Sequence, residues 1–117
     1  MRHALSVDVE DWFQVGAFEA VIDRADWDTL LPRVEGNTDA VLALFAESGV
    51  KATFFTLGWV AARYPGLIRR IVDAGHELAS HGWAHDRVFT MDAAKFRADL
   101  ARARGTLEDA GGVAVTG

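Results

Sequence analysis

Residues 51–85 read KATFFTLGWVAARYPGLIRRIVDAGHELASHGWAH, and this stretch indicates the architecture of the chain. It opens with β-branched and aromatic residues, which are typical of a strand over 51–57. A helical stretch is predicted over 59–74, in which Pro65 begins the second part, where its missing N–H costs little, and Gly75 follows the last turn. A second strand is predicted over 76–80. Strand, helix and strand in this order favour two parallel strands joined by a crossover helix.

The flanking segments continue the alternation of strands and helices. A strand is predicted over 4–10, followed by a loop with a short helix over 11–31 and a helix over 38–48. After the central stretch, a helix is predicted over 91–110 and a fourth strand over 113–116. Thr38 and Thr90 are the predicted N-caps of the two helices. Four strands with crossover helices fit either an open α/β sheet or half of a (β/α) barrel, which typically needs about 250 residues.

Composition limits the chain to one domain and excludes several classes of protein. It has 117 residues, of which 50% are hydrophobic and 25% charged, so it can bury a core. Lys and Arg number 12 against 17 Asp and Glu, and the net charge of −5 argues against nucleic-acid binding. The absence of cysteine excludes disulfides and thiolate metal sites. We find neither a membrane-spanning run nor a signal-peptide core, and we expect a cytoplasmic protein.

Two histidines follow the predicted strand over 76–80, namely His81 and His85. If this segment is helical, the two side chains share one face and can bind one metal ion. A catalytic zinc site typically has three protein ligands and one open position. Gly82 stands where the protease pattern His-Glu-x-x-His has its glutamate, so that class is not supported. His76, at the start of the strand, is interpreted as a structural residue that hydrogen-bonds behind the site.

Three acidic residues, Asp8, Glu10 and Asp11, lie at the end of the first predicted strand. Parallel α/β folds bind their ligands at the carboxyl ends of the strands. Carboxylates at this edge must face water or meet a cation, because an unpaired buried charge is costly. His81 and His85 are predicted at the same edge. The combination favours a metal site of mixed histidine and carboxylate ligands.

These segments resemble the polysaccharide deacetylase family, also called the NodB-homology group. The similarity rests on four stretches, LSVDVEDWFQV at 5–15, ATFFTLG at 52–58, PGLIRRI at 65–71 and GHELASHGWAH at 75–85. The form of the first stretch further resembles the branch linked to exosortase and exopolysaccharide clusters. The resemblance implies parallel β/α units that form the N-terminal half of a distorted (β/α) barrel. Residues 1–117 would then be a partial domain without its C-terminal half.

The resemblance also implies an activity and a set of site residues. Members of this family hydrolyse N-acetyl or O-acetyl groups of polysaccharides with zinc or another divalent transition metal. His81 and His85 would be metal ligands, and Asp8 would be the catalytic base. The third ligand would be Glu10, which strand alternation places on the same face as Asp8, or Asp11, which a bulge or turn would bring in. We expect Asp11, because the strand geometry ends before it.

The chain departs from the commoner family pattern in two places. Val9 follows Asp8, where most members have a second adjacent aspartate. The family's Arg-Pro segment and its late general-acid histidine do not follow Val115. We therefore expect little activity from these residues alone. Two other functions remain open at this point, a hydrolase of cyclic amides such as imides or ureides, and a non-catalytic metal- or sugar-binding half-domain.

Overall fold

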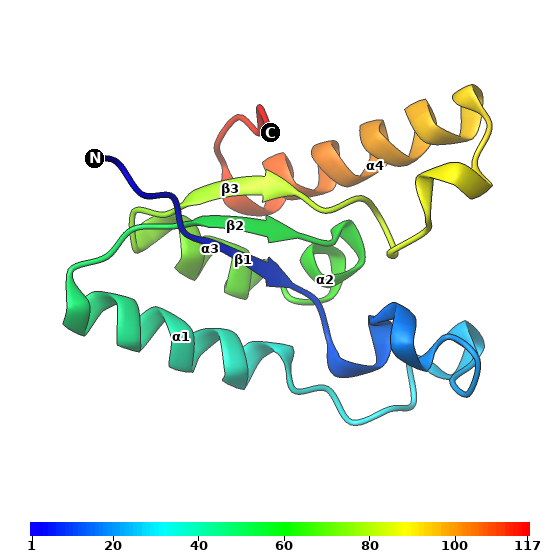
Figure 1. Ribbon diagram of the computed structural model, residues 1–117, viewed down its shortest axis with the longest axis horizontal. Coiled ribbons are helices and arrows are strands. Elements are labelled where there is room, and N and C mark those ends of the chain that lie inside the picture. Colours follow the sequence, from blue (N-terminus) through cyan, green and yellow to red (C-terminus); the bar gives the residue numbers. More distant parts are fainter.

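The computed structural model describes residues 1–117 as a three-stranded sheet with helices on one face (Figure 1). The strands are β1 (Ser6–Val9), β2 (Thr53–Thr56) and β3 (Glu77–Ser80). The α-helices are α1 (Val34–Ser48), α2 (Gly58–Arg63), α3 (Pro65–Asp73) and α4 (Ala93–Gly111). Four single-turn 3-10 helices connect them, η1 (Trp12–Gln14), η2 (Gly16–Phe18), η3 (Arg24–Asp26) and η4 (Val88–Thr90). None of the helices has the length and apolar composition needed to cross a membrane.

All three strands run parallel in the order β1-β2-β3, which confirms the predicted β/α units. Val9 pairs with Thr56, and Thr56 pairs with Ser80, so the three strands end in register. Their carboxyl ends therefore lie at one edge of the sheet. Side chains that directly follow these strands are brought together there, although they are far apart in sequence.

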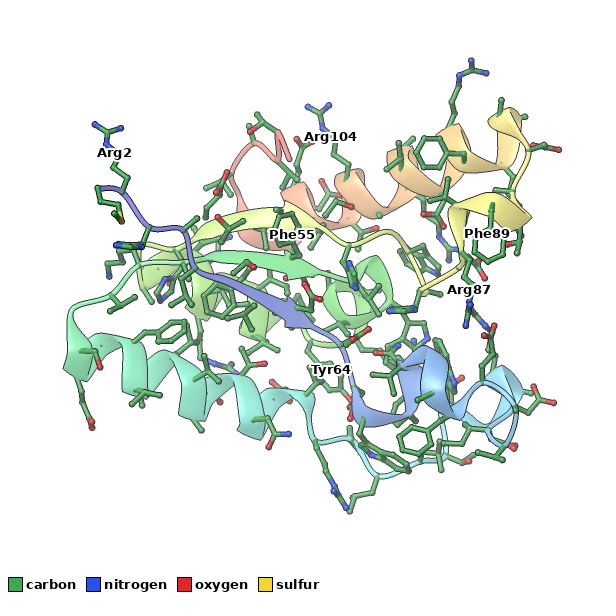
Figure 2. All side chains as sticks on the ribbon, viewed as in Figure 1. Arg2, Phe55, Tyr64, Arg87, Phe89 and Arg104 are labelled. Carbon is green, nitrogen blue, oxygen red and sulfur yellow. The ribbon has the colours of Figure 1, made fainter.

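The two faces of the sheet have different surroundings. Val9, Phe54 and Leu78 are buried against the helices and belong to the main hydrophobic core. The other face carries Asp8, which is exposed, and Phe55, which is half-buried and labelled in Figure 2. The alternation of strand side chains explains this division. A sheet covered on one face matches a segment of a (β/α) barrel, whose interior would lie on the uncovered side.

The helical stretch predicted over 59–74 forms as two helices, α2 and α3, which meet at Tyr64. Tyr64 has φ −126° and ψ 59°, outside the helical region, and Pro65 begins α3. The pyrrolidine ring of a proline disfavours helical backbone at the residue before it. Pro65 thus begins the second part of the stretch, as the sequence predicts, and separates the two helices.

Both predicted N-caps are wrong. Helix α1 begins at Val34, four residues before Thr38. The N-cap of α4 is Asp92, whose carboxylate accepts a hydrogen bond from Lys95 N at 2.7 Å. The hydroxyl of Thr90 instead donates to the Arg87 carbonyl and closes η4. An aspartate at a helix N-terminus adds a favourable charge to its hydrogen bond, which a threonine does not.

The fourth strand predicted over 113–116 does not form. The N–H of Val115 donates to the carboxylate of Glu108 at 3.0 Å, instead of to a neighbouring strand. This hydrogen bond is the main cause that lowers the pKa of Glu108, and a second hydrogen bond, from Arg104, lowers it further. The hydrogen bond from Ser80 N to Gly117 O, 2.8 Å long, still holds the segment beside β3.

His76 lies at the amino-terminal edge of the sheet and not behind the candidate site. Its Nδ1 accepts a hydrogen bond from Ala52 N at 3.2 Å, and its ring packs 4.7 Å from the ring of Phe54. Burial lowers the pKa of His76, and the charge of Lys51 lowers it further. The folded chain therefore favours a neutral imidazole at this position.

We expect acid to destabilise the chain through His76. Its pKa is lower in the folded chain than the value of about 6.5 in an unfolded chain. Stability that is present above about pH 6.5 is therefore lost as the pH falls through the lowered pKa. In a His76→Asn variant the amide oxygen replaces Nδ1 as acceptor, so its free energy of unfolding should change less between about pH 7 and 5. Urea titrations of the metal-free chains at several pH values measure this. An equal change of unfolding free energy with pH in both chains would contradict the prediction.

Candidate metal centre

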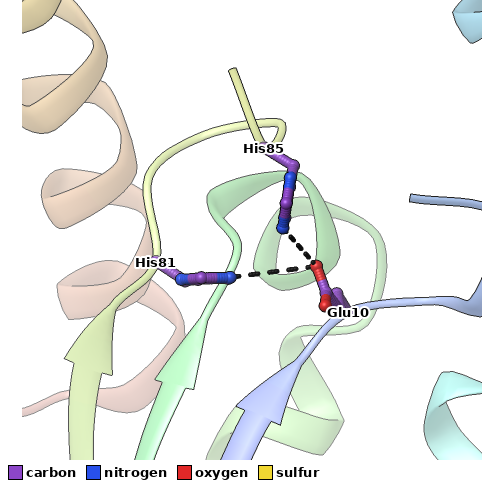
Figure 3. Close-up of side chains that lie close together, drawn as sticks. All are labelled: Glu10, His81 and His85. Carbon is purple, nitrogen blue, oxygen red and sulfur yellow. Dashed lines mark ion pairs between the residues drawn. The ribbon is translucent and has the colours of Figure 1, made fainter. Parts of the chain in front are cut away.

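Three side chains converge at the carboxyl edge of the sheet, those of Glu10, His81 and His85 (Figure 3). Glu10 directly follows β1, and His81 directly follows β3. Glu10 Oε2 lies 3.1 Å from His85 Nε2 and 3.8 Å from His81 Nε2. One possible ligand atom of each residue lies within 4.8 Å of the other two. The parallel sheet thus builds a compact cluster of one carboxylate and two imidazoles.

The segment from His81 to His85 is a loop and not a helix. His81 N donates to Thr56 O at 3.0 Å, which extends the pairing of β2 and β3 by one residue. The chain then turns through left-handed backbone at Gly82 (φ 77°) and at His85 (φ 62°). Histidine is one of the few side chains enriched in this region. The two imidazoles therefore meet through a tight turn, and not through the one-turn spacing of a helix.

The loop from His81 to His85, called the histidine loop below, is fixed to the start of α2 and to α4. Gly58 N donates to Gly82 O, and Trp59 N donates to Trp83 O, each at 2.9 Å. On the other side, Trp83 N donates to the carboxylate of Asp99 in α4 at 3.1 Å. A loop with its amides and carbonyls paired in this way holds its side chains in defined positions.

The carboxylate beside the histidines is that of Glu10, and not that of Asp11 as expected from the sequence. Asp11 is buried, and its carboxylate accepts hydrogen bonds from Trp12 N (2.9 Å), Arg33 N (3.1 Å) and Val34 N (3.3 Å). It therefore satisfies free amides at the start of α1. Strand alternation continues for one residue past β1, and this directs Glu10 toward the imidazoles.

The residues of the cluster fit a divalent transition metal. Glu10 Oε2 and His81 Nε2 are buried without a hydrogen-bond partner. Such buried polar atoms are rare and costly in folded proteins. Two imidazoles and a carboxylate are a ligand set for zinc, and also for cobalt, nickel or iron. Zinc bonds of about 2.0–2.2 Å in a tetrahedron place ligand atoms roughly 3.3–3.6 Å apart. The two separations of Glu10 Oε2 from the histidines, 3.1 Å and 3.8 Å, are close to this range.

Asp8, the predicted catalytic base, lies within β1 opposite Phe55 of β2. Its side chain is exposed on the uncovered face of the sheet. Strand alternation places Asp8 on the same side of the chain as Glu10, one pleat away. This position is compatible with a base that acts on a water molecule beside the cluster, and the role remains a prediction.

A pocket of about 370 Å³ adjoins the cluster, between the histidine loop and the first half of α4. Both histidines line it, together with charged side chains such as Arg87 and Asp99 and apolar ones such as Met91 and Phe96. Its size lies at the lower end of the range for small-molecule sites. The cluster thus faces a space that can receive part of a ligand.

Two residues near the site were missed in the sequence. The side chain of Gln14 accepts a hydrogen bond from Asp11 N at 2.7 Å and completes a capping box. The spacing Asp-x-x-Gln is a known signal for this motif and was available in the sequence. Arg24 donates to Ala84 O at 2.7 Å, across 60 residues. No local pattern indicates such a contact.

The fold and the cluster define an α/β protein with a candidate metal centre at the carboxyl ends of its parallel strands. The sequence model of the polysaccharide deacetylase family matches residues 25–117. The chain belongs to this family. The match confirms the resemblance noted in the sequence.

Individual relatives are similar over shorter stretches. The chain is 41% identical over 51 residues to the peptidoglycan-N-acetylglucosamine deacetylase of Listeria monocytogenes, which covers 44% of this chain and 11% of that protein. It is 50% identical over 48 residues to the chitooligosaccharide deacetylase of Sinorhizobium fredii, covering 41% and 22%. A family 4 carbohydrate esterase from Streptomyces lividans, solved with acetate, superposes with a TM-score of 0.72 at 25% identity, covering 96% and 46%. The chain spans less than half the length of each of these proteins.

Proposed function

We propose that this chain forms the metal-binding part of a deacetylase that acts on an N-acetylated polysaccharide. Glu10, His81 and His85 would hold zinc or a similar divalent ion, and Asp8 would be the base. The convergence of two unpartnered buried atoms, Glu10 Oε2 and His81 Nε2, carries the proposal. Membership of the deacetylase family supports it. The similarity of residues 5–15 to one family branch further suggests a role in exopolysaccharide biosynthesis.

The chain's own residues divide the chemistry between them. Glu10, His81 and His85 would hold the metal ion, which would supply polarisation of the acyl carbonyl and a lowered pKa of a water molecule. Glu10 and the two histidines would bind the ion, because one possible ligand atom of each lies within 4.8 Å of the other two. Asp8 would accept the proton of the attacking water on the uncovered side of the sheet. The pocket lined by Met91 and Phe96 offers space for the sugar that carries the acetyl group.

The leaving amine also needs a proton, and the remaining histidines are badly placed to supply it. His3 precedes β1 and His76 precedes β3, so both lie at the amino-terminal edge of the sheet. The candidate metal centre lies at the opposite edge. We therefore expect slow release of acetate from these residues alone, because general acid catalysis contributes about 10²–10⁴-fold to such reactions.

The zinc content of the purified chain tests this proposal. We expect about one zinc per chain after dialysis against a small excess of zinc, and none in a His85→Ala variant, which keeps only two ligands. A His3→Ala variant is the matched control, because His3 is exposed and distant from the cluster. Circular dichroism establishes that all three are folded. A folded chain without zinc, or a His85→Ala variant with full zinc content, would overturn the proposal.

A further inference from the structure

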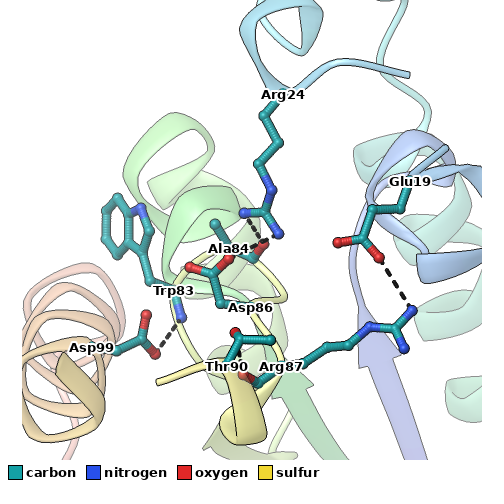
Figure 4. Close-up of polar contacts among 8 residues, drawn as sticks. All are labelled: Glu19, Arg24, Trp83, Ala84, Asp86, Arg87, Thr90 and Asp99. Carbon is teal, nitrogen blue, oxygen red and sulfur yellow. Dashed lines mark hydrogen bonds and ion pairs between the residues drawn. The ribbon is translucent and has the colours of Figure 1, made fainter. Parts of the chain in front are cut away.

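One arginine joins the histidine loop to the segment that follows β1. Arg24, the first residue of η3, donates from Nη1 to Ala84 O at 2.7 Å. Its Nη2 forms an ion pair with the carboxylate of Asp86 at 3.0 Å (Figure 4). Ala84 and Asp86 are the residues directly before and after His85. A single guanidinium therefore contacts both neighbours of this histidine.

The backbone of His85 needs such support. With φ 62°, it is the one non-glycine residue of the chain with left-handed backbone. Residues in sparsely populated backbone regions persist where their surroundings determine them from several sides. The direction of the imidazole follows from this backbone, and Nε2 points at Glu10 from 3.1 Å. A relaxation of His85 toward ordinary backbone would move Nε2 away from the other two side chains.

Arg24 is itself anchored. Its guanidinium carbon lies 5.0 Å from the centre of the Trp27 ring, and Trp27 is buried in the core. The preceding residue, Asp23, caps η3 by accepting a hydrogen bond from Ala25 N at 3.0 Å. The planar guanidinium can also hold two acceptors at once, which an ammonium group does less well. Through its contacts with Ala84 and Asp86, Arg24 thus fixes the histidine loop to a segment that packs on the core.

A second ion pair spans the same two segments without touching the neighbours of His85. Arg87 Nη2 lies 3.1 Å from Glu19 Oε2, and both side chains are exposed (Figure 4). Exposed pairs of this kind contribute little to stability. Removal of this pair is therefore a control, because it breaks a contact between the two segments and leaves the contacts of Arg24 with Ala84 and Asp86 in place.

We infer that Arg24 is a positioning residue that holds His85 in its left-handed conformation for metal binding. The inference rests on the proposed metal centre. It assigns to η3, which contributes no ligand, a specific part in building that centre. It also explains why a loop 60 residues away in sequence contacts the histidine loop at this point.

The test compares Arg24→Gln with Arg87→Gln in the full chain. We expect zinc affinity, measured by chelator competition, to fall about 10- to 100-fold in Arg24→Gln, as for other residues that orient metal ligands. Arg87→Gln should stay within about threefold of the unchanged chain. The coupling between the amide and α protons of His85 in the metal-free chains reports its backbone directly. It should change in Arg24→Gln and stay constant in Arg87→Gln, with both variants folded by circular dichroism.

The outcomes separate this inference from the proposed function. If the unchanged chain binds no zinc, the proposed function fails, while the coupling of His85 still decides whether Arg24 holds its backbone. An unchanged coupling in Arg24→Gln would overturn the inference. Zinc affinity equal to that of the unchanged chain would overturn it as well. If Arg24→Gln fails to fold, Arg24→Lys keeps the charge without the two-pronged contact and replaces it in both measurements.

Discussion

A Glu10→Gln variant should lose more than about 100-fold in zinc affinity, because even changes to residues that only orient a ligand cost about 10- to 100-fold. The amide is neutral, and its oxygen is a weaker ligand for zinc than a carboxylate. The metal-free variant should unfold at the same denaturant concentration as the unchanged chain, or at a higher one. Glu10 Oε2 is buried without a hydrogen-bond partner, so loss of its charge removes an unfavourable burial.

The matched comparison is Asp11→Asn, which should show the opposite pattern. The Asp11 carboxylate accepts hydrogen bonds from three backbone amides, one in η1 (Trp12 N) and two at the start of α1 (Arg33 N and Val34 N), and an asparagine turns a donor toward one of them. We expect a loss of about 1.5–3 kcal/mol in the free energy of unfolding, the range for hydrogen bonds to a charged group. Zinc affinity should fall less than in Glu10→Gln. Titration calorimetry and urea unfolding of both variants measure this, and zinc loss in Asp11→Asn alone would identify Asp11 as the ligand.

The contrast between these two acids shows where sequence reasoning reaches its limit. The alternation over Ser6–Val9 predicted the strand, the face of Asp8 and the possibility that Glu10 shares that face. The role of Asp11 depends on Arg33 N and Val34 N, which are 22 and 23 residues away. A contact of this length leaves no periodic signal, so the cap of α1 was missed, and Asp11 was expected beside the histidines where the structure places Glu10.

The histidine loop shows the same limit in another form. The spacing of His81 and His85 indicated a shared metal ion, and the structure brings the two side chains together. The spacing would bring them together in a helix, whereas the loop does so with left-handed backbone at Gly82 and His85. Local pattern thus identified the residues, and tertiary contacts with α2, α4 and η3 set their geometry.

The second large effect concerns Gly58, where α2 begins against the histidine loop. A Cβ at Gly58 would lie 2.5 Å from Cε3 of Trp83 and 3.0 Å from Cα of Ala103 in α4. The indole ring is rigid and the α4 backbone is packed, so neither gives way easily. We expect Gly58→Ala to lower the free energy of unfolding by about 2–3 kcal/mol, the upper part of the range for overpacking. Zinc affinity should fall with it, because Trp83 lies between the two histidines.

Gly105→Ala is the matched control for Gly58→Ala. Gly105 lies within α4, and a Cβ there would meet no atom within 4 Å. The substitution should raise the free energy of unfolding by about 0.5–1 kcal/mol, because alanine loses less backbone freedom than glycine when a helix forms. Zinc affinity should not change. Thermal and urea unfolding of the metal-free chains measure both variants. Equal stability of Gly58→Ala and the unchanged chain would show that Trp83 can move, and that close packing at Gly58 does not hold the histidine loop in place.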